Sequence, residues 1–308
     1  MTRHRSKHTK ARSHSPLGTT VRDEIHRVAR ALARHPLVYG HGTETPFDEA
    51  AALVIAACGY RHEDAPQVYA AEVSAAAKGR LQEWLHQRIH ERIPSAYLTQ
   101  MSSFAGEWYV CDPRALIPRS PLAEIIQERL SPFVDASKVK RVLDIGTGSG
   151  CIAIAIAKAF PDALVDAVDV SEEALRLAQL NATRLGVSDR VRCLASDVYR
   201  ALNGQRYDVI ISNPPYVPRA VVDALSPEYA HEPRLGLVAG EDGLSVVNAI
   251  LKDAHQHLNP QGVLVVEVGE TADTLATHYP TLPFLWLSFQ NGGDGVFLLN
   301  REHCPHGG

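Results

Sequence analysis

Over residues 21–93, apolar positions recur at three- and four-residue steps, as in VRDEIHRVARALARH, which is the spacing of one face of an α-helix. Thr45 followed by Pro46 supplies a cap and a first-turn proline for a second helical segment. A third segment, AAAKGRLQEWLHQRIHERI, continues the period. The pattern predicts a small helical domain over residues 21–102, with no strand in it.

The pattern changes in the stretch that follows. Aromatic and β-branched residues flank Ala105-Gly106 there. Residues of these types favour strands, and a glycine between two such runs favours a turn. We therefore predict a β-hairpin over residues 103–118 that links the helical domain to a second domain.

From Arg141 onward, short apolar runs alternate with helical patterns. RVLDIG, ALVDAVDV, VRCLASD, YDVIISN and GVLVVEVG are typical of buried strands, and CIAIAIAKAF and SEEALRLAQLNATRLG are typical of helices. This alternation predicts an α/β domain over residues 119–302, in which a Rossmann-like, mostly parallel sheet carries helices on both faces. Ligands of such sheets bind at the carboxyl ends of the strands.

Length and composition fit a two-domain globular protein. The chain has 308 residues, of which 45% are hydrophobic and 21% are charged, and domains of about 150 residues are common. A formal net charge of −4 argues against a general binder of polyanions. The longest apolar run is much shorter than the ~18 residues that a membrane span requires, so we expect no contact with a membrane.

The five cysteines stand far apart, with no paired spacing and no clustered histidines. A zinc site or a disulfide framework needs such spacing. We therefore expect no metal site, and we expect free thiols in a reducing, cytoplasmic setting.

The first twenty residues hold five Arg or Lys, three His and no acidic residue. With almost no apolar residues, they form neither an amphipathic nor a secretory segment. We predict a disordered basic tail over residues 1–20 and a short second tail over residues 303–308. Weak attraction of the basic tail to ribosomal or other RNA is the alternative.

A glycine-rich turn follows the first strand of the alternating region. In VLDIGTGSGCIAIA, the residues Gly146, Thr147, Gly148 and Gly150 lie between a predicted strand and a predicted helix. Glycines let the backbone approach a ligand closely, and the start of a helix offers free amide hydrogens; close packing is the alternative reason for them. The spacing differs from the Gly-x-Gly-x-x-Gly of dinucleotide enzymes, so pyrophosphate is not the best fit.

Carboxylates stand at the ends of three predicted strands, namely Asp144, Asp169 and Asp197. Asp144 could attract an amine, Asp169 could accept both hydroxyls of a ribose, and Asp197 could accept from an adenine amino group. Asp169 and Asp197 also have ordinary interpretations, as a helix cap and a solvated turn residue. Together the three describe a pocket for a nucleoside that carries an amine and a carboxylate, which fits S-adenosyl-L-methionine better than NAD.

The fourth predicted strand ends in SNPPY. Pro214 and Pro215 have fixed torsions and no amide hydrogen, so the chain is rigid there. The Asn213 side-chain oxygen and the Pro214 carbonyl can each accept a hydrogen bond from a planar nitrogen, which localises its lone pair and aims it at a methyl donor. Tyr216 adds a flat apolar face. We predict that these four residues form a catalytic clamp for methyl transfer to an amide or an exocyclic aromatic amine; a simple turn is the alternative.

Three further polar residues have no predicted role in the site. Glu267, in VVEVG, either lines the cofactor pocket or is an ordinary strand-end carboxylate. His231 and Glu232, in YAHEP, either shape the substrate entrance or form a satisfied loop pair, and the loop pair is favoured.

At these residues the sequence resembles the class I S-adenosylmethionine-dependent methyltransferases that carry Asn-Pro-Pro-Tyr, and specifically the protein glutamine methyltransferases. ERIPSAYLT, LIPRSP, LDIGTGSGCIAIA, SNPPYV and YAHEPRLGLVAGEDGL carry the resemblance in that order, over nearly the whole chain after the basic tail. The resemblance implies that the glycine loop, Asp169 and Asn213 contact the cofactor. It also implies that Asn213 to Tyr216 hold the substrate and that the helical domain recognises a protein.

Two sister groups share these motifs, one acting on peptide-chain release factors and one on a large-subunit ribosomal protein, uL3. YGHGTETPFDEA, FQNGGDGVFLL and IPRSPLAE resemble the ribosomal-protein group. The resemblance therefore implies methylation of a glutamine amide in that protein. The alternatives are a release-factor enzyme, an adenine methyltransferase acting on flipped bases of nucleic acid, and a non-catalytic binding module.

Overall fold

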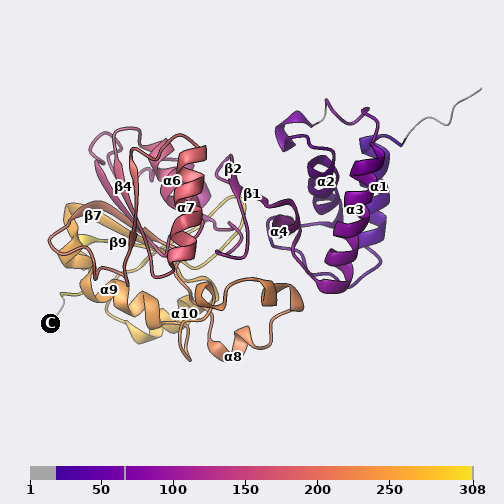
Figure 1. The fold of residues 1–308 in the computed structure, drawn as a ribbon. Helices are drawn as coiled ribbons and strands as arrows, with labels where there is room; N and C mark the ends of the chain where they lie inside the picture. The colour runs from indigo at the N-terminus through magenta and orange to yellow at the C-terminus, as the bar shows by residue number, and fades with distance from the viewer. Residues whose placement is uncertain (1–18, 66, 307–308) are drawn as a thin grey trace, which may run out of the picture.

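A computed structural model describes residues 19–65 and 67–306 of the chain. Figure 1 shows a group of helices beside a larger domain built on a sheet. The predicted basic tail lies outside the described residues except for Thr19 and Thr20, and so do residues 307 and 308 of the second predicted tail. These two predictions stay untested.

The N-terminal part is helical, and its helices begin where the sequence offers hydroxyl caps. Thr20, Thr45 and Ser74 each accept a hydrogen bond from the amide three residues later. Apolar residues on the facing sides of these helices, such as Leu53 and Leu81, are fully buried in a core of their own. The elements are α1 (Val21–Leu32), α2 (Pro46–Ala57), α3 (Ala75–His86), a π-helical turn (Gln87–Glu91) and α4 (Ser95–Thr99).

A hairpin follows, made of β1 (Met101–Phe104) and β2 (Glu107–Val110). Its two-residue turn is Ala105-Gly106, with φ angles of 48° and 85°, and positive φ at both positions matches the twist of a tight hairpin. The strands begin earlier and end earlier than the predicted range of 103–118. Residues 111–118 contain two prolines and form no strand, because proline cannot donate to a ladder.

The larger domain contains a seven-stranded sheet in the order β5-β4-β3-β6-β7-β9-β8. Strands β3 to β7 pair in parallel, and β9 runs antiparallel to both β7 and β8. The predicted mostly parallel α/β sheet is therefore confirmed. The strands are β3 (Arg141–Ile145), β4 (Leu164–Asp169), β5 (Val191–Ala195), β6 (Tyr207–Ser212), β7 (Leu258–Glu267), β8 (Leu285–Leu287) and β9 (Val296–Asn300).

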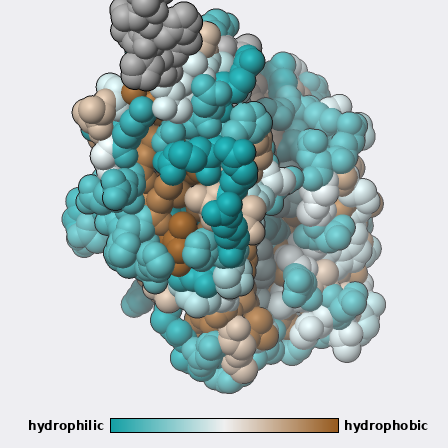
Figure 2. Space-filling view, turned by 90° about the vertical axis from the view of Figure 1, so that its right-hand side faces the viewer, coloured by the Kyte–Doolittle hydropathy of each residue, from teal (hydrophilic) through white to brown (hydrophobic). Residues whose placement is uncertain are grey.

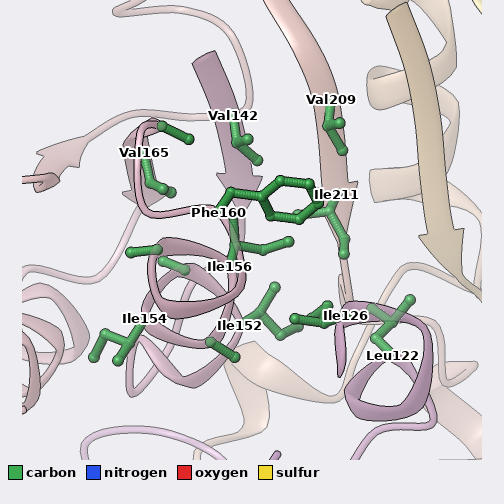
Figure 3. Close-up of a cluster of buried hydrophobic side chains, with 14 of the residues drawn as sticks. Leu122, Ile126, Val142, Ile152, Ile154, Ile156, Phe160, Val165, Val209 and Ile211 are labelled. Carbon is green, nitrogen blue, oxygen red and sulfur yellow. The ribbon is translucent and has the colours of Figure 1, made fainter. Parts of the chain in front are cut away.

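Helices cover both faces of this sheet because successive strand residues point to opposite sides. Val142 and Ile211 face α5 (Leu122–Gln127), α6 (Cys151–Ala159) and α7 (Glu172–Arg184), as the cluster in Figure 3 shows for α5 and α6. Their neighbours Leu143 and Ile210 face α9 (Ser245–His257) and α10 (Ala272–His278). Burying each such side chain contributes roughly 1.5–3 kcal/mol. No helix among the described residues is long and apolar enough to span a membrane.

A buried ion cluster, defined here as Arg88, Glu49 and Glu228, fastens the helical part to the sheet domain. Arg88 is 1% exposed; its Nε donates to Glu49 Oε1 at 2.7 Å and its Nη1 to Glu228 Oε1 at 3.1 Å. Glu228 lies in a 3₁₀ turn (Pro227–His231) that follows α8 (Arg219–Val222) in the long segment between β6 and α9. Burial acts to raise the pKa of Glu228, but the Val38 amide and Arg88 outweigh it and lower the pKa to about 2.

We expect the replacement Arg88→Ala to lower the free energy of unfolding by about 3–5 kcal/mol, because Glu49 is left buried without a charged partner. Glu228 keeps Arg92 and the Val38 amide as partners. The matched control is Arg176→Ala, since Arg176 pairs with Glu173 while both side chains are more than half exposed. That control is expected to cost less than about 1 kcal/mol. Equilibrium denaturation measures both, and an equal loss in the two variants would contradict the expectation.

Candidate active site

The glycine loop turns from β3 into α6 in the middle of the sheet. The amides of Gly146 and Thr147 both donate to the Val168 carbonyl of neighbouring β4, each at 2.9 Å. Gly146 has a φ of 71°, and a Cβ there would lie 3.9 Å from the backbone of Asn213 and Pro214. The loop and the predicted clamp are therefore adjacent, as the sequence prediction requires.

Gly150 ends the loop at the start of α6 with a φ of 80°. A Cβ at this position would lie 3.0 Å from the Cβ of Ala178 in α7. Close packing of α6 against α7 therefore explains this glycine by itself, which was the alternative reason that the sequence left open.

Asp144 is fully buried beneath the loop. Its Oδ2 accepts from the Thr147 hydroxyl at 2.6 Å and from the Ala153 amide at 3.1 Å, so the carboxyl group ties the loop to α6. Burial raises the pKa of Asp144 to about 7, although these two hydrogen bonds lower it. Its Oδ1 is buried and has no hydrogen-bond partner among the described residues.

Asp169, at the end of β4, is partly exposed beside the loop. Its Oδ2 accepts from the Gly148 amide and its Oδ1 from the Ser171 amide, both at 2.9 Å. Burial raises the pKa of Asp169, and these amides oppose the rise. The two amides fix the orientation of the carboxylate. Each oxygen can still accept a further hydrogen bond.

Asp197 follows β5, the strand next to β4, and its side chain is exposed. The Ser196 amide donates to the Asp169 carbonyl at 3.0 Å, which brings the two strand ends together. The structure thus places Asp144, Asp169 and Asp197 at one edge of the sheet.

The clamp residues follow β6. Ser212 pairs with Val266 of β7 and with Ile145 of β3, so Asn213 leaves the sheet level with the glycine loop. Pro214 is buried, and the Asn213 side chain, which is partly exposed, has no hydrogen-bond partner among the described residues. An amide that remains unpaired inside a strand-end site is free to bind a ligand.

Glu267, at the end of β7, is a contact of the clamp that the sequence prediction left out. Its side chain is 4% exposed, and its Oε1 accepts from the Tyr216 hydroxyl at 3.1 Å. Its Oε2 accepts from the Ser120 hydroxyl. Burial raises the pKa of Glu267 to about 7. The signal in the sequence was its position at the end of a strand that neighbours β6.

The described residues contain no group of three or more His, Cys, Asp or Glu side chains that could hold a metal ion. The groups that the site offers are carboxylates, backbone groups, an amide and a phenol. This donor set can hold an uncharged planar nitrogen and a ligand that carries hydroxyls and an amine.

Comparisons with known proteins show which family the chain belongs to. A model of the methyltransferase small domain matches residues 126–226. Relatives named ribosomal protein uL3 glutamine methyltransferase are 40% identical in Francisella tularensis (92% of this chain, 90% of the relative), 44% in Xanthomonas campestris (88% and 88%) and 42% in Neisseria meningitidis (92% and 94%).

The chain belongs to the uL3 glutamine methyltransferase family. The resemblance to protein glutamine methyltransferases is thereby confirmed, and so is the choice of the ribosomal-protein group over the release-factor group. The predicted class I methyltransferase fold is confirmed as well. Among solved structures, a methyltransferase from Pyrococcus furiosus is similar over 74% of this chain and 99% of that one, with 18% identity and a TM-score of 0.45.

We expect Gly150→Ala to destabilise the methyltransferase by about 2–5 kcal/mol, because backbone strain at positive φ (~1–2 kcal/mol) and overpacking against α7 (~1–3 kcal/mol) add. Gly204→Ala is the matched control: its φ is 74°, and nothing lies within 4 Å of the added Cβ. The control carries strain alone. Chemical denaturation of the two variants is the measurement, and equal losses would show that packing against Ala178 does not require Gly150.

Proposed function

We propose that this protein transfers a methyl group from S-adenosyl-L-methionine to the side-chain amide nitrogen of a glutamine in ribosomal protein uL3. The observation that carries the proposal is the unpaired Asn213 amide beside the Pro214 carbonyl, adjacent to a glycine loop, in a chain of this family.

The residues at the strand ends fit the cofactor. Gly146 and Gly148 leave room for a ligand against the backbone, and Asp169 presents an oriented carboxylate to the hydroxyls of a ribose. The free Oδ1 of Asp144 suits the amine of the methionyl group, and Asp197 suits the adenine amino group. When bound, S-adenosyl-L-methionine supplies a methyl group activated by its sulfonium.

The clamp supplies orientation and charge stabilisation for the glutamine. The Asn213 side-chain oxygen and the Pro214 carbonyl accept the two N–H bonds of the substrate amide. Because positive charge grows on that nitrogen as the methyl group is transferred, both acceptors bind the transition state more tightly than the ground state. Pro214 and Pro215 keep the acceptors in place, and the Tyr216 ring covers one face of the amide.

The helical part is proposed to recognise the ribosomal protein. Figure 2 shows the face of the molecule that carries α1 to α3. This face is largely hydrophilic, and its hydrophobic residues gather in a narrow strip. Val38, Phe47 and Tyr60 are the large hydrophobic residues of this part that are more than a third exposed. Exposed apolar residues rimmed by polar ones are typical of protein-binding surfaces.

The five free cysteines fit a reducing compartment, so we place the reaction in the cytoplasm.

The proposal is tested by incubating the full chain with methyl-labelled S-adenosyl-L-methionine and either purified uL3 or a release factor, followed by mass spectrometry of the peptides. Label on a glutamine of uL3 is expected. Label on the release factor alone would agree with the clamp mechanism but would show that uL3 is not the substrate. A third incubation contains nucleic acid in place of a protein substrate. Label on adenine there, with no label on either protein, would overturn the proposal in favour of the base-modifying alternative.

The replacement Asn213→Ala removes one of the two acceptors for the amide. It is expected to cost about 2.7–4 kcal/mol of transition-state stabilisation, or roughly a 100- to 1,000-fold slower single turnover. Asn203→Ala, at an exposed position in the turn before β6 and so at the opposite end of that strand from the clamp, serves as the control and should keep the wild-type rate. Wild-type turnover in the Asn213 variant would remove that residue from the clamp.

A further inference from the structure

The Tyr216 ring is confined on one side by backbone. A Cβ on Gly269, where φ is 49°, would lie 2.6 Å from the ring at Cε2, so the ring packs directly against this glycine. A Cβ on Gly243 would lie 2.3 Å from the Tyr216 carbonyl oxygen. Packing alone fixes how close the ring comes to the chain. The hydroxyl oxygen lies at the far end of the ring axis, so a hydrogen bond there holds that end of the ring in position.

Glu267 supplies that contact, and both of its oxygens are already engaged. One accepts from the Tyr216 hydroxyl at 3.1 Å and the other from the Ser120 hydroxyl. Ser120 in turn accepts from the Leu122 amide at 3.1 Å, at the start of α5. With 4% of its surface exposed, Glu267 has no room to turn toward a substrate. Its position suits it to orient a neighbour rather than to exchange a proton with the glutamine.

Arg119, the residue before Ser120, connects this network to the helical part through Glu232. Arg119 lies 2.9 Å from both oxygens of Glu232, which is 3% exposed. Glu232 also accepts from the Ile117 amide at 3.0 Å and lies 3.3 Å from His41 Nε2. The segment from Ile117 to Ser120 is therefore fixed at one end by Glu232 and contacts Glu267 at the other.

We propose that Glu267 is a positioning residue, which acts with Ser120 to hold the Tyr216 ring flat against the substrate amide. This inference rests on the proposed function. A ring that loses its acceptor can tilt away from the plane of the amide. The lone pair of the amide nitrogen then points away from the methyl group, and orientation of this kind controls the chemical step. The loss is therefore expected in kcat more than in KM.

The kinetic test compares four variants of the full chain: Glu267→Ala, Glu267→Gln, Tyr216→Phe and the double variant Glu267→Ala/Tyr216→Phe. Glu267→Ala and Tyr216→Phe should each lower kcat about 10- to 100-fold, the range for a hydrogen bond to a charged group. Glu267→Gln keeps an acceptor for Tyr216 and should stay within about threefold of wild type. The double variant should be no slower than about threefold below the slower single variant, because both changes remove one contact.

Two controls separate positioning from a general effect. Glu270→Ala, at an exposed neighbouring carboxylate, should keep the wild-type kcat. Binding of S-adenosylhomocysteine, measured by calorimetry, should be unchanged in all variants, since Glu267 faces the clamp. Multiplicative losses in the double variant, a wild-type rate in Glu267→Ala, or weakened binding of S-adenosylhomocysteine would each overturn the proposal.

A measurement without turnover keeps this inference separate from the proposed function. The full chain is labelled with 3-fluorotyrosine, and the ¹⁹F signal of Tyr216 is assigned by its disappearance in Tyr216→Phe. Glu267→Ala should shift and narrow that signal as the ring becomes mobile, and Glu267→Gln should restore it. An unchanged signal in Glu267→Ala would overturn the positioning role even if glutamine methylation is confirmed, and the expected shift would support it even if the substrate proves to be different.

Discussion

Strands β3 and β6 are hydrogen-bonded in parallel from Val142 and Val209 to Ile145 and Ser212. Their carboxyl ends are therefore level, and the chain leaves each end in a different way. After β3 it turns through glycines into a helix, and after β6 it is held extended by two prolines. This pairing places the glycine loop beside the start of the clamp: a Cβ added to Gly146 would lie 3.9 Å from the backbone of Asn213 and Pro214. At this point in the sheet the helices change sides, as at ligand sites of other parallel sheets.

Two acidic residues of the site, Asp144 and Glu267, hold its parts in place through hydrogen bonds within the protein. Asp144 ties the glycine loop to α6, and Glu267 connects Tyr216 with Ser120. Both are buried, and burial raises the pKa of each to about 7. Such groups cost free energy to desolvate, so each must be held by hydrogen bonds. In return they fix the loop and the ring with little freedom to move, which suits a reaction that depends on orientation.

The attachment of the helical part follows the same physics. Glu228 and Glu232 come from the segment that follows the clamp, and each is buried against an arginine. Arg88 belongs to the helical part, whereas Arg119 belongs to the connection between the two parts. The segment that follows the clamp is thus held in place by buried charge pairs that would be costly to separate. The sequence favoured a simple loop pair for His231 and Glu232. In the structure both contact other parts of the chain instead: the His231 ring lies 2.8 Å from the Glu91 carbonyl, and Glu232 pairs with Arg119.

The sequence by itself determined the local elements, the sheet class and the strand ends that bear the chemistry. Helix caps such as Thr45, the short apolar run of β6 and the glycines before α6 depend on neighbours within a few residues, so they can be recognised along the chain. Only the tertiary structure decided which buried charges meet. Arg88 and Glu228 are 140 residues apart, and Glu267 and Ser120 are 147 apart. Nothing local fixes such partners, because a charge becomes costly to leave unpaired only after folding has removed it from water.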